Sequence, residues 1–174
     1  GDCIQNCRRA YRVIDEETGE ELVLDNKFVM SPKDLCTIGF IGDILQSGVT
    51  VLKIEGRARP PEYVYTVTKA YREAIDSFYS GTLSREKIIE LKQELGKVYN
   101  KGFWEGGYYL GKKLGEWSGI KGSASTEEKE YVGKILNYFK KKGVALVVIE
   151  SGSIKFGEEI MVLGPTTGIA RRKL

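Results

Sequence analysis

Residues 31–57 read SPKDLCTIGFIGDILQSGVTVLKIEGR, and this stretch decides the fold. Ser31 is a favourable N-cap and Pro32 suits the first position of a helix, so a helix is predicted to start there. Gly48 is the expected end of that helix. Residues 49–54 are apolar and β-branched, which is typical of a strand. The stretch therefore predicts a helix that leads directly into a strand.

A second candidate strand, residues 27–30, precedes the helix and completes a strand–helix–strand unit with a parallel sheet. Lys53, Glu55 and Arg57 then lie at the carboxyl end of the later strand, where such folds place active sites. Lys53 and Glu55 share one face because side chains alternate along a strand. Arg57 could bind a carboxylate or a phosphate. The alternative is an ion pair that closes the sheet edge.

Local signals also define the neighbouring elements. Residues 11–14 and 21–24 form two short strands around a polar turn with Gly. A helix is expected from Pro60-Pro61 to Gly81, and Ser84 caps another helix.

The last third of the chain has a different pattern. Residues 101–117 are rich in Gly and aromatic side chains, which either pack one domain onto another or stack on nucleobases. A small, polar linker follows at 118–126. The strands expected after it belong to a small all-β domain: 131–139, 144–149 and 160–163. Because three strands rarely close a barrel, only part of such a domain is expected.

Composition excludes several kinds of chemistry in this segment. The 174 residues contain no His, which removes His-dependent triads and His metal ligands. General acid–base catalysis in this segment would have to use Asp, Glu, Lys, Tyr or Cys. The net charge of +3 permits contact with nucleic acid without indicating it. The longest apolar run, residues 144–149, is far too short for a membrane span, and no targeting segment is visible.

The three cysteines are Cys3, Cys7 and Cys36. Their odd number argues against a disulfide framework and favours reduced thiols in the cytoplasm. Cys3 and Cys7 have metal-ligand spacing, and Cys36 could be a third ligand. Arg8 and Arg9 beside Cys7 would lower the thiolate pKa. Structural thiols and metal ligands both remain open on this pattern.

Three motifs in order resemble the U32 peptidase family, also called collagenase-like proteases: GDC-x3-CR at 1–8, SPKDLC at 31–36, and LKIEGR at 52–57 followed by PEY at 61–63. The resemblance implies a fold that is α/β plus all-β. Residues 1–80 would be the closing βα units of a TIM-like barrel, and 81–122 a helical connector. Residues 123–174 would be part of a small elongation-factor-like β-barrel.

The resemblance also implies a set of site residues. Some family members hold an iron–sulfur cluster on four cysteines, so Cys3, Cys7 and Cys36 are expected metal ligands, with zinc as the alternative metal. Two further ligands would lie upstream of residue 1, and the fragment alone would be inactive. The expected catalytic residues are Lys53, Glu55 and Arg57, and the expected substrate-binding residues are Arg8 and Tyr63.

Two activities and one binding role follow as hypotheses. The family label is peptidase, which implies a peptide substrate, whereas several members resemble hydroxylases that modify tRNA, ribosomal RNA or a ubiquinone precursor. The leading hypothesis is that the chain belongs to the tRNA uridine hydroxylase branch, with tRNA as its partner. The third hypothesis is a non-catalytic module that binds RNA or protein. A cytoplasmic protein without membrane contact is expected, and it could form a homodimer.

Overall fold

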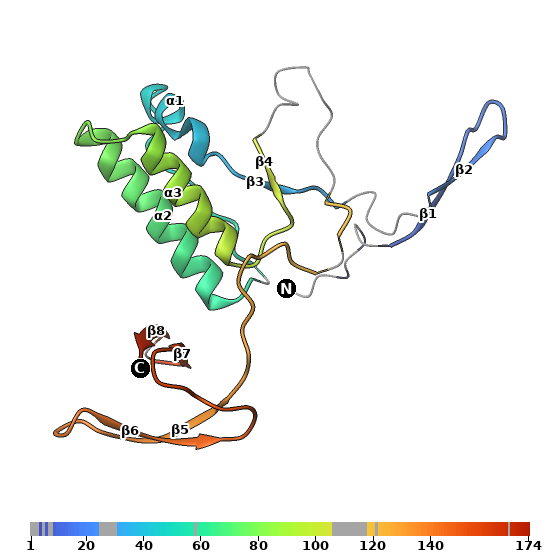
Figure 1. Cartoon of the computed structure of the whole chain (residues 1–174). Helices are drawn as coiled ribbons and strands as arrows, with labels where there is room; N and C mark the ends of the chain where they lie inside the picture. The colour runs from blue at the N-terminus through green and yellow to red at the C-terminus, as the bar shows by residue number, and fades with distance from the viewer. Residues whose placement is uncertain are drawn as a thin grey trace. The chain divides into compact units, whose positions relative to one another are not determined.

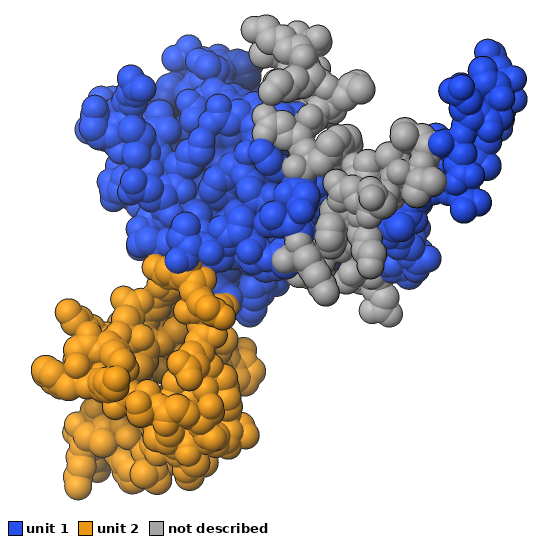
Figure 2. Space-filling model, turned by 45° about the vertical axis from the view of Figure 1, so that its right-hand side comes forward, with its two compact units in different colours: residues 1–126 blue, residues 127–174 orange. Residues whose placement is uncertain are grey.

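The computed structural model describes residues 4, 6, 9–24, 31–57, 59–105, 118–120, 122–166 and 168–174. The chain divides into two compact units, residues 1–126 and 127–174, which Figure 2 colours separately. Each unit is described by itself. Helices and small two-stranded sheets are both present in the described residues. The domain boundaries after residues 80 and 122, and the two barrels, stay predictions.

Two helices, α2 (Pro61–Tyr79) and α3 (Arg85–Lys97), lie side by side in the first unit (Figure 1). Pro61 occupies the first turn of α2, as predicted. The Ser84 hydroxyl accepts a hydrogen bond from the Lys87 backbone N–H at 3.1 Å and caps α3. Gly81, in the left-handed region at φ 72°, follows α2. Both predicted helices are confirmed.

The helix predicted from Ser31 begins later than expected. Residues Asp34–Leu35 form strand β3, a 3-10 turn covers Ile38–Phe40, and helix α1 runs only over Ile41–Gln46. β3 pairs in parallel with β4 (Phe103–Trp104), and the Asp34 N–H donates to the Gly102 carbonyl at 2.9 Å. This distant pairing overrides the local capping signal at Ser31.

The end of α1 agrees with the sequence. The backbone N–H of Ser47 donates to the Asp43 carbonyl at 3.1 Å. Gly48 then adopts φ 87°, a left-handed conformation that glycine tolerates without steric cost. The predicted end of the helix is therefore confirmed.

Residues 49–54 are not a strand among the described residues. Their side chains alternate as a strand's would, with Val51 80% exposed and Leu52 and Ile54 packed on the core. A strand also needs a hydrogen-bonding neighbour, and none of the described residues pairs with this segment. The predicted strand at 49–54 is therefore not found among the described residues, and candidate strand 27–30 lies outside them, so the strand–helix–strand unit stays a prediction.

The core of the first unit lies where α1, α2, α3 and the turn after β3 meet. Small residues on α2 allow close packing, and the Phe78 ring lies 3.6 Å from where a Cβ on Gly42 would be. The core residues come from all four elements: Cys36, Ile38, Ile41, Leu45, Val67, Ala70, Ala74, Leu91, Leu95 and Val98.

The hairpin predicted near the start of the chain is confirmed. β1 (Tyr11–Ile14) pairs antiparallel with β2 (Glu21–Leu24), and Tyr11 lies opposite Leu24. The Asp15 carboxylate accepts hydrogen bonds from the N–H groups of Glu17 and Thr18, both at 2.8 Å. This is the local turn chemistry expected of Asp.

The second unit contains two antiparallel hairpins, β5 (Gly133–Phe139) with β6 (Val144–Ile149) and β7 (Glu159–Gly164) with β8 (Gly168–Lys173). The three predicted strands of this region are confirmed. Strand β8 was not predicted from the sequence. None of the helices in the described part of the chain is long and apolar enough to cross a membrane.

Candidate functional site

Cys36 occupies the position immediately after β3, and it is one of the most enclosed residues of the first unit. It is 4% exposed, and its backbone N–H donates to the Trp104 carbonyl at 2.8 Å. The β3–β4 pairing thus fixes the backbone of Cys36, while the helical core surrounds its side chain.

Tyr71 of α2 contacts Thr37, the residue that follows Cys36. Its hydroxyl oxygen accepts a hydrogen bond from the Thr37 backbone N–H at 2.9 Å and lies 3.1 Å from the Thr37 hydroxyl. Burial raises the pKa of Tyr71, and the hydrogen bond with the Thr37 side chain acts in the opposite direction. Tyr71 therefore ties helix α2 to the segment that carries Cys36.

The surroundings of Cys36 decide which chemistry suits its thiol. Burial raises the thiol pKa, while the Ile38 backbone N–H, the Lys92 charge and the Tyr71 hydroxyl act in the opposite direction. A nucleophilic cysteine needs access and a lowered pKa, and Cys36 has neither. A buried sulfur with nearby N–H and O–H donors fits a structural thiol or one ligand of a metal cluster.

A charged pair borders this site. Lys92 on α3 contacts Glu105, with 2.7 Å between Nζ and Oε1. The hydrogen bond with Glu105 raises the pKa of Lys92, so the amine stays protonated. A Cβ on Gly39 would lie 3.5 Å from the same Glu105 oxygen, which shows how closely the turn after β3 approaches this pair.

The described residues contain no cluster of three or more side chains of the types that bind metals. Cys3, Cys7 and Arg8 lie outside the described residues, so the structure places only Cys36 of the predicted ligand set. The metal-ligand and Arg8 assignments stay predictions.

The three predicted catalytic residues lie on the exposed side of the extended segment. Lys53, Glu55 and Arg57 alternate with the half-buried Leu52 and Ile54, as the strand-like periodicity predicted. One Glu55 carboxylate oxygen accepts a hydrogen bond from the Arg57 backbone N–H at 2.7 Å. These charges thus form one exposed patch, and their catalytic role stays a prediction.

A partly buried ionic group lies beside this patch, and the sequence analysis did not find it. The Asp34 carboxylate contacts the Arg59 guanidinium at 2.6 Å, and Arg59 also lies over the rings of Tyr63 and Tyr99. These four residues are called the Asp34–Arg59 cluster below. The two charged residues are 25 positions apart, so no local pattern links them.

Tyr63, the predicted substrate-binding tyrosine, is half-buried within the Asp34–Arg59 cluster. The Arg59 guanidinium lies 5.2 Å from the centre of its ring. Burial raises the Tyr63 pKa, and the positive charge of Arg59 opposes that effect. The structure thus assigns the Tyr63 ring a contact within the protein.

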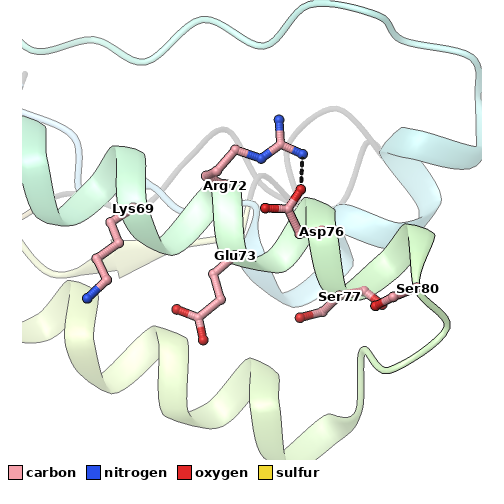
Figure 3. A pocket seen from close by; sticks show the side chains of 6 residues that line it. All are labelled: Lys69, Arg72, Glu73, Asp76, Ser77 and Ser80. Atoms are coloured by element: carbon pink, nitrogen blue, oxygen red, sulfur yellow. Dashed lines mark hydrogen bonds and ion pairs between the residues drawn. The ribbon is translucent and has the colours of Figure 1, made fainter.

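A shallow pocket on the surface of α2 is a weaker candidate (Figure 3). Arg72 and Asp76 form an ion pair at 2.5 Å, and Glu73 pairs with Lys87 of α3. Opposite charges that neutralise each other on an exposed helix are typical of a solvated surface. The residues that line the pocket are Lys69, Arg72, Glu73, Asp76, Ser77 and Ser80.

Comparison with known proteins identifies the family. The model of Peptidase family U32 matches residues 1–119. The chain therefore belongs to peptidase family U32, and the resemblance carried by the three motifs is confirmed.

Relatives in this family carry two kinds of name. A collagenase of Porphyromonas gingivalis is 51% identical over 174 residues, which are all of this chain and 42% of the relative. An uncharacterized protease of Methanocaldococcus jannaschii is 39% identical over 97% of this chain and 42% of its own length. The tRNA hydroxylation protein P1 of Bacillus subtilis is 31% identical over 95% of this chain and 40% of its own length.

The chain thus spans less than half the length of each of these relatives. No solved structure matches it.

Proposed function

We propose that this chain is part of an iron–sulfur-dependent enzyme that hydroxylates RNA, with tRNA as the substrate. The observation that carries the proposal is the burial of Cys36, which is 4% exposed and packs within the helical core, with the Ile38 N–H and the Tyr71 hydroxyl beside its sulfur. A nucleophile needs access for its substrate, whereas a cluster ligand can lie in an enclosed, hydrogen-bonded site. The 31% identity to a protein named for tRNA hydroxylation, over 95% of the chain, supports it.

Cys36 would hold the cluster together with Cys3, Cys7 and thiolates from the rest of the protein; zinc is the alternative metal. When bound, an iron–sulfur cluster supplies electron transfer. The residues of this chain would prepare the site for it. The Ile38 N–H and the Tyr71 hydroxyl would stabilise a Cys36 thiolate, and the surrounding apolar core would exclude water from it.

The exposed patch of Lys53, Glu55 and Arg57 would face the substrate. Two cationic side chains suit the phosphates of RNA, and Arg57 can bind an oxyanion through two parallel hydrogen bonds. The Glu55 carboxylate, which accepts from the Arg57 backbone N–H, limits the conformations open to this turn. Arg8 and the Tyr63 hydroxyl would complete substrate binding.

The second unit would add phosphate contacts. Arg171 is engaged with Glu127 at 3.5 Å and with Glu159 at 3.2 Å, so part of the basic charge of β8 is neutralised. The exposed turn between β5 and β6, which contains Lys140, Lys141 and Lys142, is the better candidate. Such contacts weaken as salt rises, because binding releases counterions.

The fold that this proposal implies is a TIM-like barrel closed by residues 1–80 and a small elongation-factor-like β-barrel that includes 123–174. An RNA substrate would also place the enzyme in the cytoplasm.

Iron and acid-labile sulfide in the anaerobically purified full-length protein test the proposal. The parent protein should contain both, and Cys36→Ser should lower both. Ile38→Val is the matched control, because Ile38 is a fully buried neighbour whose shortening disturbs the core by about 1 kcal/mol without removing a sulfur. The parent gene should also restore hydroxylated tRNA in a deletion strain. A parent protein without iron, or with unmodified tRNA, would refute the proposal.

A peptidase is the second candidate, and the names of two relatives favour it. The collagenase and the uncharacterized protease match nearly the whole chain at 51% and 39% identity. In this case the nucleophile or the general base would come from outside the residues around Cys36, whose thiol is buried and has a raised pKa. Collagen or gelatin cleavage that survives iron removal would support this candidate.

A further inference from the structure

The segment that carries Lys53, Glu55 and Arg57 is anchored at both ends. None of the described residues pairs with residues 49–54 as a strand, so the anchors that the structure shows are side-chain packing and the contacts of Arg59. At one end, Leu52 and Ile54 pack against the core. The other end reaches Arg59, whose backbone N–H donates to the Gly56 carbonyl at 3.0 Å.

Gly56 brings this end of the segment against helix α2. A Cβ at this position would lie 2.9 Å from Cγ2 of Val64, closer than real contacts allow. The backbone at Gly56 therefore lies too close to Val64, in the first turn of α2, for a Cβ to fit unless the Val64 side chain shifts.

Arg59 is held from three sides. Its guanidinium lies 2.6 Å from the Asp34 carboxylate, 4.5 Å from the centre of the Tyr99 ring and 5.2 Å from that of Tyr63. The side chains of Arg59 and Asp34 are only 14% and 22% exposed, so water screens their attraction less than at an open surface. Cation–π contacts add to it.

Asp34 connects Arg59 to the strand pair beside Cys36. One carboxylate oxygen contacts Arg59, and the other accepts a hydrogen bond from the Lys101 backbone N–H at 2.9 Å. The Asp34 N–H donates to the Gly102 carbonyl at 2.9 Å. Cys36, the proposed ligand, is only two residues after Asp34 in the same chain segment.

We propose that Arg59 is a positioning residue, which through Asp34 and the rings of Tyr63 and Tyr99 holds the Lys53–Arg57 segment in a fixed place relative to Cys36. For substrate this inference rests on the proposed function, whereas the anchoring itself does not. Arg59 acts through the three exposed residues and does not itself touch substrate.

Limited trypsin digestion of the full-length protein, followed by mass spectrometry, tests the anchoring. Trypsin cleaves after Arg57 but not after Arg59, because Pro60 follows, so Arg59→Met leaves the sites unchanged. Arg59→Met should accelerate cleavage after Arg57 by roughly ten- to a hundredfold, as expected when a charge-assisted hydrogen bond is lost. Cleavage after Lys69, within α2, should stay the same.

Two further variants make the test specific. Asp34→Asn removes the charge and keeps an oxygen for the Lys101 N–H, and it should accelerate cleavage after Arg57 in the same way. Asp76→Asn weakens the exposed Arg72–Asp76 pair on α2 without changing a trypsin site and is the matched control; it should not accelerate cleavage after Arg57. In the active enzyme, Arg59→Met should raise KM for tRNA while the iron content stays close to the parent value.

The inference is overturned if cleavage after Arg57 is unchanged, or if cleavage after Arg57 and Lys69 rises equally, since the latter shows a general loss of stability. A parent protein without iron or tRNA hydroxylation would refute the proposed function, and the digestion would still decide the anchoring. Faster cleavage after Arg57 with unchanged KM would overturn the role in substrate binding.

Discussion

Replacing Tyr71 by Phe removes one oxygen atom from the surroundings of Cys36 and leaves the ring in place. In the parent protein this oxygen accepts from the Thr37 N–H at 2.9 Å and lies 3.1 Å from the Thr37 hydroxyl. The Thr37 N–H is part-buried, and the variant leaves it without that acceptor. An enclosed donor that loses its partner costs about 1–3 kcal/mol.

That cost should appear at the Thr37 amide. Because about 1.4 kcal/mol corresponds to tenfold in an equilibrium constant, amide hydrogen exchange at Thr37 should accelerate by roughly ten- to a hundredfold. Exchange is measured in the full-length protein by mass spectrometry of peptides that cover residues 34–40. The neighbouring Cys36 amide, which donates to the Trp104 carbonyl, should change less.

Tyr65→Phe is the matched control. Tyr65 is on the same helix and is 56% exposed, and its replacement by Phe removes the same hydroxyl group. Amide exchange in the Tyr65→Phe variant should therefore match that of the parent protein. If Tyr71→Phe and Tyr65→Phe give the same exchange at Thr37, the hydroxyl of Tyr71 does not hold this segment, and the argument for its place beside Cys36 fails.

Three other predictions concern stability. Burial raises the pKa of Tyr63, so the folded state binds the phenol proton more tightly than the unfolded state does. The stabilisation that results is fully present below the ordinary pKa of tyrosine and is lost as the pH rises through the folded-state pKa. Thermal unfolding measured across this pH range should show stability falling, and the fall should be less steep in Tyr63→Phe. Gly133→Ala places a Cβ 1.9 Å from the Val148 carbonyl oxygen and should disrupt the β5–β6 hairpin, seen as lost amide protection there. Gly96→Ala on α3, which has open space around it and no positive φ, should keep that protection. Ser84→Ala removes the N-cap hydrogen bond of α3 and should destabilise the protein by about 1 kcal/mol in urea unfolding; an unchanged midpoint would contradict the capping role.

Local signals predicted the elements whose determinants lie within a few residues of each other. Pro61 and Ser84 start α2 and α3, and Gly48 follows α1, because capping and turn chemistry act over one helical turn. The start of the helix after Ser31 was wrong for the opposite reason. Asp34 binds a backbone N–H 67 residues away and a guanidinium 25 residues away, and no local pattern contains those partners.

The candidate site divides in the same way. Cys36 could be named from a motif, and the alternation of Lys53 and Glu55 follows from extended geometry. Tyr71 and Arg59 could not be found, because each gains its role from a contact between segments brought together by folding. Apolar side chains at 49–54 predicted a strand, but pairing requires a neighbour, and the sequence of one strand does not specify it.

The short parallel pairing of β3 with β4 also sets an order of events during synthesis. Cys36 leaves the ribosome well before Trp104, whose carbonyl accepts its backbone N–H in the folded protein. Contacts between distant parts of a chain form late, since the loop between them must first be closed. A newly made chain thus presents the Cys36 thiol to metal donors, and equally to oxidants, until the β4 residues emerge and pair with β3.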